Sequence, residues 1–189
     1  MLKRTALATA ALLVGAAPAF AHLNPAEHGS MMAGLSHPLL GLDHILAMVA
    51  VGLWAAQLGG RATWAVPAAF VGTMMAGFLG GMAGLSLLFV EPTILASVVV
   101  LGLLVAASVR LPVALSATLV GVFALFHGHA HSAELGSAGA LAFGAGFAVS
   151  TALLHAVGVG LGLSLGRHQA VSRLLGVGTA VAGLALMAG

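Results

Sequence analysis

The chain has 189 residues, of which 61% are apolar and only 5% are charged, against roughly 25% charged residues in ordinary globular domains. With a mean hydropathy of +1.16, this composition excludes a soluble enzyme and a disordered chain and predicts a protein of the lipid bilayer. The absence of cysteine excludes disulfides, thiolate metal sites and iron–sulfur clusters, and no basic cluster is present for nucleic-acid binding. The chain nevertheless contains nine histidines, an unusually polar feature in so apolar a sequence, and they need a chemical explanation.

The first 21 residues have the pattern of a secretory signal peptide. Lys3 and Arg4 precede an apolar run over 6–17, and small residues at Ala19 and Ala21 follow as a cleavage site. Cleavage after Ala21 would make His22 the first residue of the mature chain. We therefore expect a signal peptide at 1–21 and one membrane domain at 22–189, with an uncleaved first helix as the alternative.

Six further stretches are apolar enough to cross a bilayer, which takes about 20 residues at ~1.5 Å per residue. We expect these spans at 37–58, 64–86, 92–109, 112–133, 137–165 and 169–188. The predicted fold is an all-α integral membrane protein with six transmembrane helices after a cleaved signal peptide. Small residues four apart favour close helix packing, either within one chain or in a homo-oligomer. They are Gly77 and Gly81, Gly80 and Gly84, and the series Gly158, Gly162 and Gly166.

The charged residues predict the orientation of these spans. All arginines after the signal peptide fall on one side, and all glutamates fall on the other. The arginines are Arg61, Arg110, Arg167 and Arg173, and the glutamates are Glu27, Glu91 and Glu134. Because positive residues stay in the cytoplasm, we expect a bacterial inner-membrane protein with both mature termini on the periplasmic side. An exported N-terminus requires the same orientation.

The first span carries the only acidic residue expected well inside the membrane. Asp43 follows His37 and precedes His44, and such a buried ionisable group indicates a functional site. His37 and His44 are seven residues apart, so one continuous helix would place them on the same face, with Met48 one turn further. Asp43 could bind a cation directly or hold an imidazole tautomer. Pro38 is expected at the first helical position, which places His37 at the outer mouth.

The fourth span ends in a second cluster of candidate metal ligands. His127 and His131 are four residues apart and Glu134 is seven from His127, so all three share one helix stripe, while His129 faces away. Two imidazoles at this spacing form a clip for a divalent metal. The cluster lies at the same outer depth as the first, so we expect the two to meet.

Three other histidines are weaker candidates. His155 lies past the middle of the fifth span. It is expected with equal weight to be a second metal-binding station or a structural residue held by a hydrogen bond. His22 and His28 precede the first span, where metal capture competes with simple solvation. Imidazole and carboxylate without thiolate suit Ni²⁺, Co²⁺ or Zn²⁺ better than Mg²⁺ or Ca²⁺.

The two clusters resemble the motifs of the HupE/UreJ nickel permeases. The first is His37, Asp43 and His44 with the continuation Ala47-Met48 and Gly52, and the second runs from Phe126 to Glu134 with Ser132 where the family has glycine. Leu154-His155 and Gly158 are similar to a third, less specific feature. The resemblance implies a six-span transporter over 22–189 whose functional positions are His37, Asp43, His44, His127, His131 and Glu134.

The resulting hypothesis is a secondary, ATP-independent importer of Ni²⁺ without a prosthetic group, and not an enzyme. The sequence has no GxxxxGK[ST] nucleotide-binding motif. The expected partners are the divalent ion, the lipid bilayer and, indirectly, the machinery that matures nickel enzymes. Transport of Co²⁺ or Zn²⁺ by the same site is one alternative. A zinc-dependent intramembrane hydrolase using Glu134 as base and Ser132 is another, and a metal sensor within a larger assembly is a third.

Overall fold

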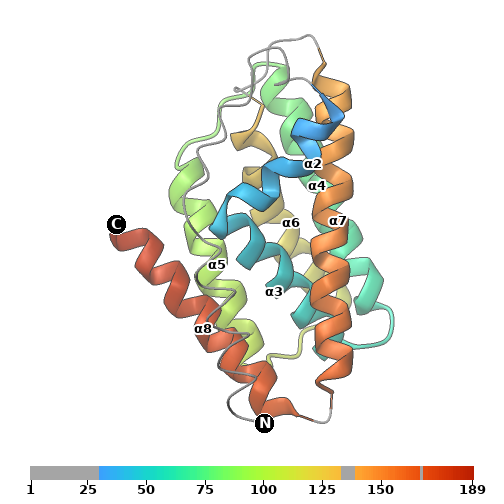
Figure 1. The fold of residues 1–189 in the computed structure, drawn as a ribbon, viewed down its shortest axis with the longest axis vertical. Helices are drawn as coiled ribbons and strands as arrows, with labels where there is room; N and C mark the ends of the chain where they lie inside the picture. Colours follow the sequence, from blue (N-terminus) through green and yellow to red (C-terminus); the bar gives the residue numbers. More distant parts are fainter. Residues whose placement is uncertain (1–29, 133–138, 167) are drawn as a thin grey trace.

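The chain is described by a computed structural model that covers residues 30–132, 139–166 and 168–189. The predicted signal peptide, Glu27 and Glu134 lie outside the described residues, as does Arg167. All regular structure within the described residues is helical, with no strand among them (Figure 1). The helices are α2 Met31–Leu40, α3 Leu42–Leu58, α4 Ala62–Met82, α5 Val90–Ala107, α6 Val113–Ala130, α7 Ala140–Ser164 and α8 Gln169–Ala188.

Five helices, α4 to α8, are long and apolar enough to cross a membrane. The predicted span 169–188 coincides with α8, and the other four agree with α4 to α7 to within a few residues. Helix α2 and helix α3 pass the same test only when taken together. The described residues therefore contain five candidate spans, or six when α2 and α3 are counted as one.

The first predicted span is not a continuous helix. Helices α2 and α3 meet at an angle of 87°, and Gly41 between them is extended with φ −99° and ψ 119°. Pro38 lies inside α2 rather than at a first helical position, because α2 already begins at Met31, with the Ser30 hydroxyl accepting from the Ala33 amide at 3.0 Å. Proline removes a helical hydrogen bond and crowds the preceding turn, so Pro38 weakens α2 from within. The expectation that His37 and His44 share one helix face is therefore wrong.

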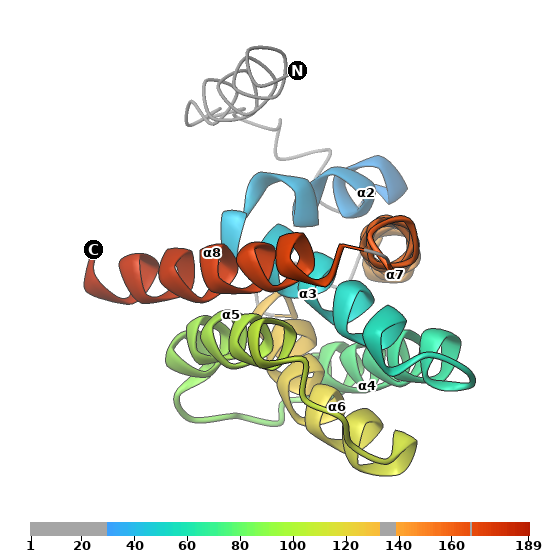
Figure 2. The same ribbon diagram turned by 90° about the horizontal axis from the view of Figure 1, so that it is seen from below.

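Helices pack as close pairs at glycine contacts. Helix α3 lies against α7, α4 against α6, and α5 against α8, as the two ribbon views show (Figures 1 and 2). A Cβ atom on either glycine of each pair would overlap the backbone of the other helix, so these positions require the smallest residue. The glycines are Gly52 and Gly158 for α3–α7, Gly77 and Gly128 for α4–α6, and Gly102 and Gly176 for α5–α8.

The predicted glycine series is only partly a packing device. Gly77 and Gly158 make the contacts just described, and Gly162 lies against Ala56 and Leu53 of α3. Gly84 instead adopts a left-handed conformation with φ +88°, in the link after α4, so it ends a helix rather than packing one.

One end of the bundle is tied together by polar contacts around the arginines. Trp54 Nε1 donates to the Val109 carbonyl at 2.8 Å, and Arg173 Nε donates to the Ser108 hydroxyl at 3.2 Å. Arg61 lies before α4 and Arg110 lies between α5 and α6, at this same end. Glu91, in the first turn of α5, lies at the opposite end. The predicted separation of arginines from this glutamate is present in the described chain.

Candidate metal centre

Four histidines from three helices form a contiguous cluster at the end of the bundle away from the arginines. His37 comes from α2, His44 from α3, His127 from α6, and His131 caps the C-terminus of α6. The centroid of the His131 ring lies 4.3 Å from that of His37 and 4.8 Å from that of His44. The His44 and His127 centroids are 4.9 Å apart. The break at Gly41 thus brings both histidines of the first motif against the second motif.

Asp43 and three of these rings form a chain of hydrogen bonds. Asp43 Oδ1 lies 3.1 Å from His44 Nδ1, His44 Nε2 lies 2.7 Å from His131 Nε2, and His131 Nδ1 lies 2.9 Å from His37 Nε2. A carboxylate accepts hydrogen bonds, so His44 Nδ1–H donates to it and leaves a lone pair on Nε2. For neutral rings, His131 Nε2–H then donates to His44, and His37 Nε2–H donates to His131 Nδ1. The position of Asp43 therefore sets the direction of the whole chain.

In this arrangement His37, His131 and His44 are bonded to one another through facing ring nitrogens, whereas His127 Nε2 contacts the Ser97 hydroxyl. No group of three or more histidine, aspartate or glutamate side chains is arranged to hold a metal ion among the residues that the structure describes. A cation entering between His44 and His131 would have to replace their 2.7 Å contact with two metal–nitrogen bonds. His37, His44 and His131 are thus metal-competent donors in a mutually hydrogen-bonded state.

Aromatic side chains of α7 border the cluster. The Phe147 ring lies 5.0 Å from His131, and the Phe143 ring lies 5.4 Å from His37, measured between centroids. Both phenylalanines are buried, at 0% and 3% exposure. Since apolar walls exclude water, a charge placed among these histidines would interact with them more strongly than in solvent.

His155 lies apart from the four clustered histidines, beyond Phe70. The centroid of the Phe70 ring is 5.6 Å from that of His127 and 4.9 Å from that of His155. His155 is 1% exposed, and neither ring nitrogen has a hydrogen-bond partner among the described residues. Burying an unpaired polar group costs about 1–3 kcal/mol, and the described residues offer these two nitrogens no hydrogen bond that would offset this cost.

The remaining candidates are not part of this cluster as far as it is described. His22, His28 and Glu134 lie outside the described residues. His129 faces away from the cluster, as predicted, and its Nε2 accepts from the Leu87 amide at 3.4 Å. It belongs to the contact between α6 and the link from α4 to α5 rather than to the histidine chain.

Sequence reasoning missed two residues that touch the cluster. Phe70 stands between His127 and His155, and the Ser97 hydroxyl lies 3.0 Å from His127 Nε2. A phenylalanine in an apolar span gives no signal of its own. Ser97 interrupts the hydrophobic run of α5, which is the only trace that the sequence offers.

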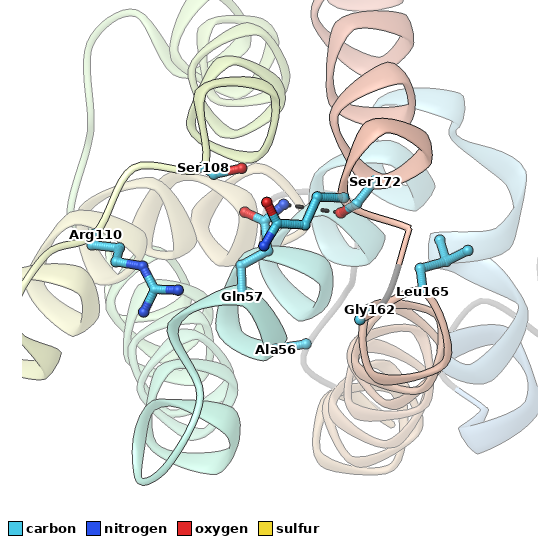
Figure 3. Close-up of a pocket in the computed structure, with 9 residues that line it drawn as sticks. Ala56, Gln57, Ser108, Arg110, Gly162, Leu165 and Ser172 are labelled. Atoms are coloured by element: carbon cyan, nitrogen blue, oxygen red, sulfur yellow. Dashed lines mark hydrogen bonds between the residues drawn. The ribbon is translucent and has the colours of Figure 1, made fainter.

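A polar cavity of about 170 Å³ lies at the arginine end (Figure 3). Its lining includes Gln57 of α3, Arg110 and Ser172 of α8. Gln57 Nε2 donates to Ser172 Oγ at 2.9 Å and to the Val105 carbonyl at 3.1 Å, so it joins three helices. The positive charge of Arg110 opposes a cation here, which makes this cavity a structural junction rather than a metal site.

Comparison of the sequence with known proteins assigns the chain to a family. The family model described as HupE / UreJ protein matches residues 10–186 of the chain. Protein HupE of Rhizobium leguminosarum bv. viciae is 47% identical over 185 residues, which cover 96% of this chain and 97% of that protein. No solved structure matches the chain.

Proposed function

The chain belongs to the HupE/UreJ family, and on that premise we propose that it is a secondary, ATP-independent importer of Ni²⁺, with Co²⁺ as the next candidate and Zn²⁺ as the third. The observation that carries this proposal is the chain Asp43–His44–His131–His37, which gathers imidazole nitrogens from α2, α3 and the end of α6. Imidazole suits borderline divalent transition metals, whereas Mg²⁺ and Ca²⁺ prefer oxygen ligands.

Asp43 has a double task in this proposal. Its carboxylate faces His44 Nδ1 at 3.1 Å, so it orients the ring and turns the Nε2 lone pair toward His131. It also supplies negative charge close to the incoming dication, which would otherwise be costly to move into an apolar region. The contact with His44 favours an indirect role for Asp43 over direct ligation in the state described.

Binding and release then follow from the exchange of weak bonds. The entering ion loses water and gains imidazole ligands, while the ring–ring hydrogen bonds at 2.7 Å and 2.9 Å are broken. Because those bonds re-form when the ion leaves, they offset part of the cost of its release, which favours the weak binding that conduction requires. His37 and Glu134 serve capture, and His127 and His155 serve as later stations on either side of Phe70.

The proposed setting is the bacterial inner membrane, with the arginine end in the cytoplasm. Arg61, Arg110 and Arg173 lie at that end, in agreement with the positive-inside rule. The histidine cluster then faces the periplasm. The signal peptide over 1–21 and the mature termini outside the cytoplasm belong to the same proposal.

Metal uptake into proteoliposomes containing the purified protein tests this function. Liposomes with the parent protein should accumulate Ni²⁺ and Co²⁺ faster than empty liposomes, without ATP, and a parallel Zn²⁺ measurement orders the three ions. His131→Gln should reduce uptake about tenfold or more, because His131 contacts both His37 and His44.

His129→Gln is the matched control on the same helix. His129 contacts the Leu87 amide instead of the cluster, so its variant should transport like the parent. The proposed transport function is contradicted if liposomes with the parent protein accumulate none of the three ions. The site assignment fails if His131→Gln transports as fast as His129→Gln.

A further inference from the structure

A serine on α5 and a histidine on α6 form a buried pair beside the cluster. Ser97 and His127 are both 0% exposed. Ser97 Oγ lies 2.6 Å from the carbonyl oxygen of Ile94 and 3.0 Å from His127 Nε2. These two contacts together fix the position of the proton on the histidine ring.

The hydroxyl has one hydrogen and two neighbours that compete for it. The Ile94 carbonyl can only accept, so the 2.6 Å contact requires the Ser97 hydroxyl to donate to it. The Ser97 oxygen must then accept from His127, which makes Nε2 the protonated nitrogen. A neutral imidazole carries one proton, so its Nδ1 bears the lone pair.

His127 Nδ1 is buried and has no hydrogen-bond partner among the described residues. Its ring stands nearly perpendicular to that of His44, at 85° and 4.9 Å between centroids. This lone pair is therefore held next to the hydrogen-bonded chain but is not engaged by it. Unlike the His44 and His131 nitrogens, it is available to a cation without breaking an existing hydrogen bond.

We propose that Ser97 is a positioning residue that holds His127 as the Nε2–H tautomer, so that Nδ1 is the nitrogen that binds a divalent transition metal. The inference rests on the proposed function to the extent that the cluster binds such an ion. Neutral metal-binding histidines commonly donate their second ring nitrogen to a neighbouring oxygen, which orients the ring and raises its basicity. The Ser97 hydroxyl is that oxygen for His127.

Ser116 offers a matched comparison within the bundle. It is also 0% exposed, on α6, and its hydroxyl has no hydrogen-bond partner among the described residues. Ser97→Ala and Ser116→Ala remove the same atom from equally buried sites. Only the first change touches a histidine.

The tautomer can be read from metal-free protein by ¹⁵N NMR with labelled histidine. The His127 signals are assigned by their loss in His127→Gln. In the parent and in Ser116→Ala, Nδ1 should have the chemical shift of an unprotonated nitrogen and Nε2 that of a protonated one. In Ser97→Ala the two tautomers should mix, because the acceptor for Nε2–H is gone.

Equilibrium dialysis with Ni²⁺ then measures affinity in detergent. Ser97→Ala should bind Ni²⁺ about tenfold or more weakly than the parent, which is the usual effect of losing such a partner, and Ser116→Ala should bind like the parent. A protonated Nδ1 in the parent, or an unchanged Ni²⁺ affinity in Ser97→Ala, overturns the inference.

The uptake assay separates this inference from the proposed function. Ser97-dependent binding without uptake supports the role of Ser97 and contradicts transport. Uptake by a parent whose Ni²⁺ affinity does not depend on Ser97 contradicts only the role of Ser97. A parent that neither binds nor transports Ni²⁺ overturns both.

Discussion

In the proposed mechanism the Asp43 side chain acts on the histidine cluster in two ways, through its negative charge and through the hydrogen bond that orients His44. Asp43→Asn keeps an oxygen that can accept from His44 Nδ1–H at the observed 3.1 Å, but it removes the negative charge beside the site. We expect Ni²⁺ uptake to fall about tenfold or more, while the protein still elutes as a folded species in size-exclusion chromatography. Uptake equal to that of the parent would show that the charge is not needed.

Gly41 leaves room for the Asp43 and His44 side chains, whereas its backbone conformation does not need glycine. Its φ of −99° and ψ of 119° suit any residue, but a Cβ there would lie 2.7 Å from Asp43 Oδ1 and 3.1 Å from His44 Nδ1. We expect Gly41→Ala to displace the carboxylate and to reduce Ni²⁺ uptake severalfold at ion concentrations below saturation. Gly72→Ala, where a Cβ meets nothing within 4 Å, should transport like the parent. Equal uptake by the two variants contradicts this view of Gly41.

At this scale the sequence could predict which residue types gather but not how they are joined. The spacing placed the first and second histidine motifs at one depth, and His44 and His131 do approach to 2.7 Å. It could not predict the order of the hydrogen bonds, since that depends on which ring nitrogen faces which neighbour. The sequence showed Ser97 only as a polar residue in an apolar run, because its contact with His127 depends on α5 lying against α6.

At the scale of helices, the closest contacts between neighbouring helices are made at glycines. Two glycines of α8 allow a controlled test of how much such a contact contributes to stability. A Cβ on Gly176 would overlap the Ala106 backbone nitrogen of α5, whereas a Cβ on Gly178 of the same helix meets nothing within 4 Å. We expect Gly176→Ala to lower the free energy of unfolding by about 1–3 kcal/mol, because the helices must separate. Gly178→Ala should be neutral, or stabilising by up to about 1 kcal/mol from helix propensity.

Unfolding in SDS followed by tryptophan fluorescence measures both variants. Trp54, which is fully buried and donates to the Val109 carbonyl near the α5–α8 contact, reports on this region. Close packing of α5 and α8 through Gly176 is contradicted if the two alanine variants unfold at the same detergent fraction.

Hydropathy located the spans but could not locate the bend. Segments that face lipid must be apolar, so the predicted 169–188 coincides with α8. The break at Gly41 was missed because Leu39, Leu40 and Leu42 keep the surrounding sequence as apolar as any span. A bend changes direction without changing composition. Broken helices nonetheless recur at transporter binding sites, and here the break at Gly41 lies two residues before Asp43 of the candidate site.

At the scale of the whole molecule, the distribution of charged residues predicts how the protein is oriented in the membrane. The link from α4 to α5 and the start of α8 are separated by three helices, α5, α6 and α7, so they should lie on opposite faces of the membrane. Ser86 is exposed in the first of these, and His168 is exposed at the N-cap of α8 without capping it through its side chain. Because the sequence has no cysteine, Ser86→Cys and His168→Cys each introduce a single reactive thiol.

A maleimide that does not cross membranes tests the orientation in intact cells. The positive-inside rule places the end with Arg61, Arg110 and Arg173 in the cytoplasm, because lysine and arginine are retained there. The cysteine at position 86 should therefore react from outside, whereas the cysteine at position 168 should react only after the membrane is opened. Reaction of both from outside would contradict the three crossings between them. The reverse pattern would place the histidine cluster on the cytoplasmic side and contradict capture from the periplasm, so this measurement also tests on which side of the membrane the site meets its ion.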